Sequence, residues 1–355
     1  MAEKVLMKGN EAIGEAAVIA GCRYYFGYPI TPQSELIEYM AKRLPQVDGV
    51  FLQAESEIAA INMVYGAAGA GGKVMTSSSS PGISLKQEGI SYIAAAELPC
   101  VIVNIMRGGP GLGGIQPAQG DYFQATKGGG HGDYHCIVLA PNSVQEMAEL
   151  TVQAFNLADQ YRNPVMILGD GALGQMMEPV DFQDLPVITV AKPWATTGMG
   201  EREQPNRIDT LRLNPETLEE VNQALQRIYA GLQAKEARWQ ETLTADAELI
   251  LVAYGISARI AYSAMELARA QGYKVGIFRP VTLWPFPKAA LAKAAANACA
   301  LLTVELSAGQ MVEDVELAIK CSRPVHFYGR TGGVLMDPQA VFEQIADIFA
   351  AKEGK

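Results

Sequence analysis

Short apolar runs alternate with longer segments of helical period over the first half of the chain. The apolar runs, which predict strands, are Arg23–Gly27, Val50–Gln53, Val74–Ser78, Val101–Met106, Cys136–Ala140 and Val165–Leu168. Before and between them, apolar residues recur at helical spacing in Asn10–Ala20, which opens the domain, and in Gln33–Leu44, Glu55–Ala70, Ser84–Ala96 and Ser143–Gln160. This alternation predicts an α/β domain over residues 1–178, with a doubly wound parallel sheet covered by helices on both faces.

The pattern weakens over residues 179–245, where prolines interrupt it and a polar amphipathic helix is expected over Glu216–Leu243. We interpret this stretch as a connector. A second, smaller α/β unit is predicted over residues 246–355, since strands and helices alternate there again. Its expected elements are strands Leu249–Tyr254, Lys274–Phe278 and Ala300–Glu305, helices Ser257–Gln271 and Lys288–Ala296, then a helix, a strand and a closing helix after Asp337.

Composition narrows the functional classes. The chain has 355 residues, of which 49% are hydrophobic, so it can bury two cores. Its net charge of −10 and its lack of any Lys/Arg-rich run argue against nucleic-acid binding. The N-terminus is mixed and charged, and no apolar run reaches membrane-spanning length. We therefore expect a cytoplasmic protein without membrane contact.

The five cysteines are widely scattered and form no CxxC pair. The sequence therefore predicts neither a zinc site nor an iron–sulfur cluster in this chain, and buried thiols are expected. His131 and His135 have no acidic cluster beside them, so no metal site is predicted there either.

The first candidate for chemistry is Thr31, in the turn Tyr28-Pro29-Ile30-Thr31-Pro32 that follows a predicted buried strand. Pro32 suits the first position of the helix expected next. Thr31 is then either an ordinary N-cap, which is the simpler interpretation, or part of a site for an anionic ligand at the start of a helix.

Glu57 is the second candidate. Steps of four and three residues from Glu57 reach Ile61, Val64 and Ala68, an apolar stripe, whereas Glu55 begins a more polar face. A carboxylate at the start of a buried face needs a partner, or its pKa rises. Glu57 is therefore a candidate proton carrier; the alternative is an acid that merely stabilises the first turn of its helix.

Arg107 is the third candidate, because it ends an apolar strand and enters a glycine-rich loop over residues 108–132. A guanidinium at that edge of an α/β sheet suits a carboxylate ligand, although an ion pair with a surface acid is the simpler interpretation. The loop contains GxGxxG at residues 109–114, but Pro117 and Gly120 follow where a dinucleotide-binding helix would begin. A mobile lid is the better interpretation.

Three further motifs have structural explanations. Gly169-Asp170-Gly171 resembles part of a Mg²⁺–diphosphate signature, but no asparagine follows in the expected region, so we predict a strand-end turn. Residues 279–287, rich in proline and aromatic residues, are expected to pack in the core. Residues 304–310 are expected to form a strand-to-helix turn.

In series, several of these motifs resemble the alpha subunits of the 2-oxoacid:ferredoxin oxidoreductases. The resemblance runs in order along nearly the whole chain. The motifs are Tyr28-Pro29-Ile30-Thr31-Pro32, Glu55-Ser56-Glu57, TSSSSPG at 76–82, Arg107-Gly108-Gly109-Pro110, TLWPFP at 282–287 and ELSAGQ at 305–310.

The resemblance implies a thiamine-diphosphate-binding fold, with a pyrimidine-binding domain followed by a transketolase C-terminal-like domain. It implies that Glu57 contacts the aminopyrimidine ring and is the catalytic proton carrier, and that Thr31 and Arg107 bind the carboxylate of a 2-oxoacid. Further cofactor contacts are implied for Tyr28, Pro29, Ile30, Ser80 and Pro81.

The resemblance also implies partners. A beta subunit would hold the diphosphate and Mg²⁺, and gamma and ferredoxin-like delta subunits, with [4Fe-4S] clusters, would pass electrons to ferredoxin. The implied reaction is oxidative decarboxylation of a 2-oxoacid to acyl-CoA and CO₂. The outside alternatives are a transketolase or pyruvate-dehydrogenase type of enzyme, and a non-catalytic Rossmann-like binding subunit.

The loop after Arg107 bears on the choice of 2-oxoacid. It departs from the RGGPSTG of many 2-oxoglutarate members and is more similar to the branched-chain (2-oxoisovalerate) members. Leu112 and Ile115 would suit an aliphatic side chain, and Lys127 is the one nearby cation for a second carboxylate. We expect 2-oxoisovalerate, with 2-oxoglutarate or pyruvate as alternatives.

Overall fold

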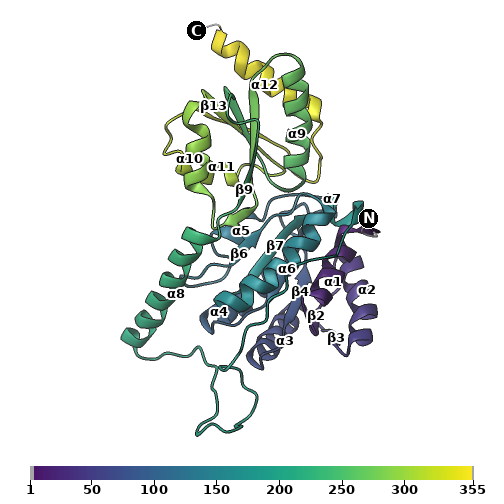
Figure 1. Cartoon of the computed structure of the whole chain (residues 1–355), viewed down its shortest axis with the longest axis vertical. Coiled ribbons are helices and arrows are strands. Elements are labelled where there is room, and N and C mark those ends of the chain that lie inside the picture. The colour runs from purple at the N-terminus through teal and green to yellow at the C-terminus, as the bar shows by residue number, and fades with distance from the viewer. Residues whose placement is uncertain (1–3, 354–355) are drawn as a thin grey trace.

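The N-terminal domain is built on a seven-stranded sheet, as seen in a computed structural model that describes residues 4–353 (Figure 1). The strand order is β12-β6-β7-β5-β4-β2-β3, and every neighbouring pair is parallel except β12 with β6. The predicted parallel sheet is thus confirmed. Its strands are β2 (Tyr24–Gly27), β3 (Val50–Gln53), β4 (Val74–Ser78), β5 (Val101–Met106), β6 (Ile137–Leu139), β7 (Val165–Asp170) and β12 (Thr282–Trp284).

Helices surround this sheet close to their predicted positions. They are α1 (Gly9–Ile19), α2 (Ser34–Arg43), α3 (Glu57–Gly69), α4 (Ser80–Ala95), α6 (Val144–Tyr161) and the short α5 (Tyr122–Thr126) and α7 (Gly171–Gln175), with a 3₁₀ turn at Leu44–Val47. The N-terminus of α3 is set by Ser56, whose hydroxyl accepts a hydrogen bond from the Ala59 N–H at 3.2 Å. Glu57 is therefore the first residue of α3, two positions later than expected.

The starts of α2 and α4 also differ from expectation. Helix α4 begins at Ser80 rather than Ser84, with Pro81 in its first turn, where proline loses no intrahelical hydrogen bond. Helix α2 begins at Ser34, and Gln33, not Thr31, holds the N-cap position. The interpretation of Thr31 as an N-cap is therefore wrong.

The C-terminal domain has a five-stranded sheet of order β14-β13-β10-β11-β9. The predicted polar helix is shorter than expected: α8 (Pro215–Lys235) ends before Glu236, and Trp239–Thr242 form the antiparallel edge strand β9. The other elements are β10 (Leu249–Val252), α9 (Gly255–Ala270), β11 (Val275–Pro280), α10 (Lys288–Ala294), a 3₁₀ turn at Ala295–Asn297, β13 (Ala300–Glu305), α11 (Met311–Ala318), β14 (Val325–Gly329) and α12 (Pro338–Glu353). Strands β1 (Val5–Lys8) and β8 (Met177–Val180) pair separately.

Gln119 fastens the two domains together. Its side chain donates a hydrogen bond to the Tyr254 carbonyl at 2.9 Å, and its Oε1 accepts from Ser257 at 2.7 Å and from the Leu306 N–H at 3.0 Å. Gln119 is fully buried, so each of these bonds replaces water at the seam. Strand β12, which follows β11, adds a further connection because it joins the N-terminal sheet. The two domains are therefore held by buried polar contacts as well as by packing.

The predicted core segment at residues 279–287 is confirmed as packing, because Val281, Leu283, Trp284 and Phe286 are all buried. Three cysteines are buried, but Cys299 and Cys321 are exposed, which corrects the expectation of buried thiols throughout.

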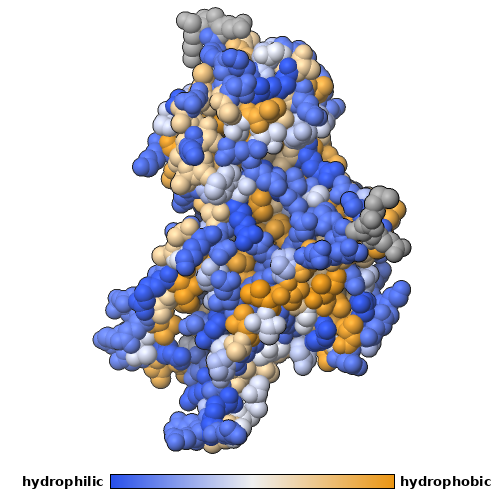
Figure 2. Space-filling view, viewed as in Figure 1, coloured by the Kyte–Doolittle hydropathy of each residue, from blue (hydrophilic) through white to orange (hydrophobic). Residues whose placement is uncertain are grey.

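Figure 2 shows a mostly hydrophilic face, with apolar residues exposed in patches on the lower, N-terminal domain. Among the described residues, no helix is long and apolar enough to cross a membrane.

Candidate active site

Glu57 lies at the first turn of α3 with only 6% of its surface exposed, as its place on the apolar stripe predicted. Its carboxylate faces Gly82 in the first turn of α4. A Cβ added to Gly82 would lie 2.6 Å from Glu57 Oε1 and 2.1 Å from Ser78 Oγ. Glycine at this position therefore leaves the space that the carboxylate occupies.

The β4–α4 junction beside Glu57 is rich in hydroxyl groups. Ser78 and Ser79 are fully buried, and within residues 4–353 neither hydroxyl has a hydrogen-bond partner. Buried polar groups in folded proteins are nearly always paired, so these two hydroxyls are candidates for hydrogen bonds to a polar ligand.

Ser80, predicted as a cofactor contact, donates a hydrogen bond to Asp121 Oδ2 at 2.6 Å, and Asn104 donates to the same oxygen at 2.9 Å. Burial raises the pKa of Asp121, against the lowering effect of these two hydrogen bonds. Sequence reasoning missed Asp121 and Asn104, because Asp121 lies in the glycine-rich loop and Asn104 within an otherwise apolar strand.

Arg107 is buried where β5 ends, and it connects three predicted site segments. Its Nη1 donates to the Thr31 carbonyl and its Nη2 to the Leu112 carbonyl, both at 2.9 Å. Its backbone N–H donates to Ser80 Oγ at 3.1 Å. The Nε atom is buried, and the described residues provide no acceptor for it. The guanidinium thus retains a donor for an anionic ligand.

A cavity of about 660 Å³ opens beside Arg107, between the two domains. The N-terminal domain contributes Ser80, Pro81, Arg107 and Asp121, and the C-terminal domain contributes Ser307 and Gln310. The wall from the C-terminal domain is the predicted strand-to-helix turn at 304–310. It is confirmed, because buried Glu305 accepts hydrogen bonds from the N–H groups of Gln310, Met311 and Val312 at the start of α11.

Not every predicted residue lines this cavity. Tyr28, Pro29 and Ile30 lie in the turn after β2, with Tyr28 exposed, and Thr31 reaches Arg107 through its backbone carbonyl. Leu112 and Ile115 extend into solvent, with 84% and 58% of their surfaces exposed. Residues 109–116 form an exposed loop, and no helix follows the GxGxxG motif before Tyr122.

Asp170, in the GDG motif, is confirmed as part of a strand-end turn. It caps α7 by accepting hydrogen bonds from the N–H groups of Ala172 and Leu173, and it also accepts one from the N–H of Ile256 in the other domain. Burial raises the pKa of Asp170 to about 6.

Lys86 is the most unexpected residue near the site. It is fully buried in α4, and its Nζ donates to Thr76 Oγ1 at 2.5 Å and to the Ser77 carbonyl at 3.1 Å. A sequence signal was present, because Ile83, Lys86 and Ile90 share one helical face.

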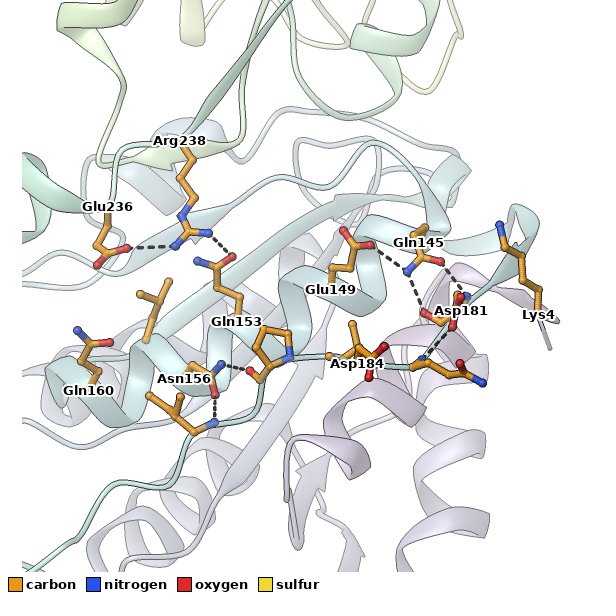
Figure 3. Close-up of a pocket in the computed structure, with 15 residues that line it drawn as sticks. Lys4, Gln145, Glu149, Gln153, Asn156, Gln160, Asp181, Asp184, Glu236 and Arg238 are labelled. Carbon is orange, nitrogen blue, oxygen red and sulfur yellow. Dashed lines mark hydrogen bonds and ion pairs between the residues drawn. The ribbon is translucent and has the colours of Figure 1, made fainter. Parts of the chain in front are cut away.

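A separate groove of about 720 Å³ runs between α6 and the connector (Figure 3) and contains none of the predicted site residues. Its polar side chains bond to one another or to nearby backbone: Gln145 to Glu149, Asn156 to the Pro186 carbonyl, and Arg238 to Gln153. We therefore interpret it as a structural seam. Among the described residues, no group of three or more His, Cys, Asp or Glu side chains could hold a metal ion.

Two family profiles match the chain in order. The one described as "Pyruvate flavodoxin/ferredoxin oxidoreductase, thiamine diP-bdg" matches residues 15–242, more than half of the chain. The one described as "Pyruvate:ferredoxin oxidoreductase core domain II" matches residues 247–341. The chain belongs to the pyruvate flavodoxin/ferredoxin oxidoreductase family. The resemblance seen in the sequence and the predicted thiamine-diphosphate-binding fold are confirmed.

Relatives within this family carry the comparison along the whole chain. The ketoisovalerate oxidoreductase subunit VorB of Methanothermobacter marburgensis is 52% identical, with 97% of each chain covered. The 2-oxoglutarate synthase subunit KorA of Archaeoglobus fulgidus is 40% identical, with 92% of this chain and 95% of the relative covered. The predicted enzyme class, oxidoreductases of 2-oxoacids, is therefore confirmed for the family.

Solved structures agree with this assignment. The 2-oxoglutarate:ferredoxin oxidoreductase from Magnetococcus marinus superposes with a TM-score of 0.87 at 26% identity; it covers 98% of this chain, which spans 65% of that one. A split-gene transketolase superposes over 95% of this chain and 93% of its own, with a TM-score of 0.58 at 16% identity, which is a likeness of fold.

Proposed function

We propose that this chain is the subunit that binds the pyrimidine half of thiamine diphosphate in a 2-oxoacid:ferredoxin oxidoreductase complex. The complex would oxidatively decarboxylate a branched-chain 2-oxoacid, 2-oxoisovalerate, to acyl-CoA and CO₂ and reduce ferredoxin. The observation that carries the proposal is the buried Glu57 carboxylate facing Gly82 beside the hydroxyl groups of the β4–α4 junction.

The residues present fit the pyrimidine half of the cofactor. Glu57 supplies a carboxylate for a ring nitrogen. The hydroxyls of Ser78 and Ser79, which have no partner within residues 4–353, would bond to polar ring atoms. Tyr28, Pro29, Ile30, Ser80 and Pro81 remain proposed contacts. When bound, thiamine diphosphate supplies the carbanion and the electron sink for decarboxylation. Glu57 would hold and release the proton at its own carboxylate oxygen, in a position shielded from bulk water.

Arg107 and Thr31 are the proposed carboxylate-binding residues. The guanidinium would bind the substrate carboxylate through its Nε and through Nη2, once that atom exchanges the Leu112 carbonyl for substrate. The hydrogen bond from Nη1 to the Thr31 carbonyl would keep the guanidinium oriented during this exchange. The loop at 109–116 would then be released by substrate, consistent with its interpretation as a lid.

We propose that partner subunits supply the part of the chemistry for which this chain has no motif. We propose that a beta subunit holds the diphosphate and Mg²⁺, and that gamma and ferredoxin-like delta subunits carry [4Fe-4S] clusters to ferredoxin, all in the cytoplasm. Exposed apolar side chains near the site support a partner subunit that covers this surface. They are Ile58, next to Glu57, Leu85, next to Lys86, and Tyr28, in the turn after β2.

The choice of 2-oxoisovalerate rests on the 52% identity to a ketoisovalerate oxidoreductase subunit. Leu112 and Ile115 do not add support, because both side chains extend into solvent. 2-Oxoglutarate is the second candidate, because several 2-oxoglutarate synthase subunits are 36% to 40% identical over nearly the whole chain.

The test is purification of the native complex, followed by CoA-dependent dye reduction with 2-oxoisovalerate, 2-oxoglutarate and pyruvate. We expect the highest kcat/KM for 2-oxoisovalerate, iron in the complex, and at least a tenfold loss of kcat for Glu57→Gln, equivalent to about 1.4 kcal/mol of barrier. A smaller loss would contradict the proton role of Glu57. Activity without iron would favour a transketolase or pyruvate-dehydrogenase type of enzyme.

A further inference from the structure

Lys86 lies in α4, four residues after Gly82, the residue that the Glu57 carboxylate faces. Gly82, Lys86 and Gly89 share one face of α4 at spacings of four and three residues. At the two glycines, α4 approaches α3 closely: an added Cβ at Gly82 would meet Glu57, and one at Gly89 would lie 2.5 Å from Ile61. The buried lysine is thus on the helical face that packs near the head of α3.

The hydrogen bonds of Lys86 suit its neutral form as well as its charged form. An ammonium has three N–H donors, whereas a neutral amine has two. In the described part of the chain, Nζ has two acceptors, Thr76 Oγ1 and the Ser77 carbonyl. The third N–H of the ammonium therefore has no acceptor among the described residues, and Lys86 can lose that proton without losing either hydrogen bond.

We propose that Lys86 is a positioning residue that sets the proton affinity of Glu57. As an ammonium, Lys86 holds the Glu57 carboxylate in its ionised form. When Lys86 loses its proton, Glu57 binds its own proton more tightly. This proposal rests on the proposed role of Glu57 as the proton carrier, and it assigns a function to a buried charge that packing alone does not explain.

Among the titratable groups around this part of α4, Lys86 is the one whose pKa lies near neutral pH. Burial lowers the pKa of Lys86 to about 7, against a rise caused by Glu57. Cys100, before β5, also faces Lys86, and burial raises the pKa of its thiol. Tyr25, on β2, contacts Ser77, and burial raises its pKa likewise. Both of these groups stay neutral near pH 7.

The experiment is an infrared titration of the assembled complex, in which the carboxylic-acid stretch of Glu57 is assigned by its loss in Glu57→Gln. In Lys86→Met, we expect the apparent pKa of Glu57 to rise by at least one unit, a tenfold change in proton affinity. The acid limb of the pH–activity profile should move by the same amount. Lys86→Gln, which removes the charge and keeps an N–H donor, should give the same shift if Lys86→Met fails to assemble.

Thr76→Val is the matched control, because it removes one hydrogen bond of Lys86 and leaves the charge. We expect it to lower the melting temperature without moving the Glu57 titration. An unchanged Glu57 titration in both Lys86 variants would overturn the proposal and leave Lys86 a structural residue. Because the spectrum reads protonation without turnover, this failure is distinct from a failure of Glu57→Gln to lose activity.

Discussion

The Arg107 guanidinium donates a hydrogen bond to the Thr31 carbonyl at 2.9 Å, across a separation of 76 residues in the chain. The two residues follow β5 and β2, and β4 lies between these strands in the sheet. Parallel strands bring their carboxyl ends to one edge, where α/β folds bind ligands. The long arginine side chain spans that edge and ties the two turns into one site.

Arg107→Lys should weaken substrate binding. Lysine keeps the charge but has no rigid fork of donors, so it cannot bond to Thr31 and to a carboxylate in the same geometry. We expect KM for the 2-oxoacid to rise at least tenfold, about 1.4 kcal/mol, with unchanged thiamine diphosphate affinity. Steady-state kinetics and cofactor titration measure the two effects.

The control for this prediction is Arg259→Lys, because Arg259 makes a partly exposed ion pair with Glu178. Such pairs contribute little, so its KM should match that of the wild type. A KM for Arg107→Lys within twofold of wild type would remove Arg107 from the substrate site.

Gly82→Ala should displace the carboxylate of Glu57, the proposed proton carrier. The added Cβ would lie 2.1 Å from Ser78 Oγ and 2.6 Å from Glu57 Oε1, closer than real contacts allow. We expect kcat to fall at least tenfold and the melting temperature to fall as well. Gly66→Ala in α3 is the matched control, because its Cβ would meet nothing within 4 Å. Alanine there should stabilise the helix by about 0.5–1 kcal/mol. Equal melting temperatures for the two variants would contradict the crowding argument.

Asp170 should make stability pH-dependent. Its pKa rises from 3.8 to about 6 on burial, so between these values the folded chain binds a proton that the unfolded chain has released. The contribution of Asp170 to the free energy of unfolding therefore falls as pH rises through this window and is constant on either side. The full change is about 3 kcal/mol.

The measurement is urea unfolding of wild type and Asp170→Asn from pH 3.5 to 7, the range set by that window. The variant is uncharged throughout, so the difference in unfolding free energy between the two proteins should shrink as pH rises. A difference that stays flat would show that Asp170 does not titrate in the folded protein.

Gln119→Leu should loosen the domain seam. The variant leaves the Leu306 N–H and the Ser257 hydroxyl without their acceptor, and the Tyr254 carbonyl without a donor. We expect a loss of roughly 3 kcal/mol or more in unfolding free energy. Gln226→Leu, on the exposed surface of α8, should change stability by less than about 0.5 kcal/mol. Equal losses in both variants would argue against the seam.

The sequence by itself determined most elements of the N-terminal sheet and the buried face of α3. The alternation of apolar and helical segments predicted six strands of the N-terminal sheet. The apolar stripe of Ile61, Val64 and Ala68 predicted that Glu57 lies on a buried face, as found. Both inferences use spacing within one segment, and that spacing depends on local backbone geometry. The series of motifs also predicted the family, because each motif consists of residues that are adjacent in the chain.

Only the tertiary structure decided which of these segments meet. The packing of the strands and helices places Thr31 beside Arg107 and Gly82 beside Glu57. Strand β9 belongs to the C-terminal sheet and β12 to the N-terminal sheet, and the local pattern of neither segment specifies this. The surroundings of Lys86 were also decided by the tertiary structure. Helical periodicity predicts that Lys86 is buried, but its acceptors lie in β4 and its acidic neighbour lies in α3. Contacts between segments depend on long-range packing, which no local period encodes.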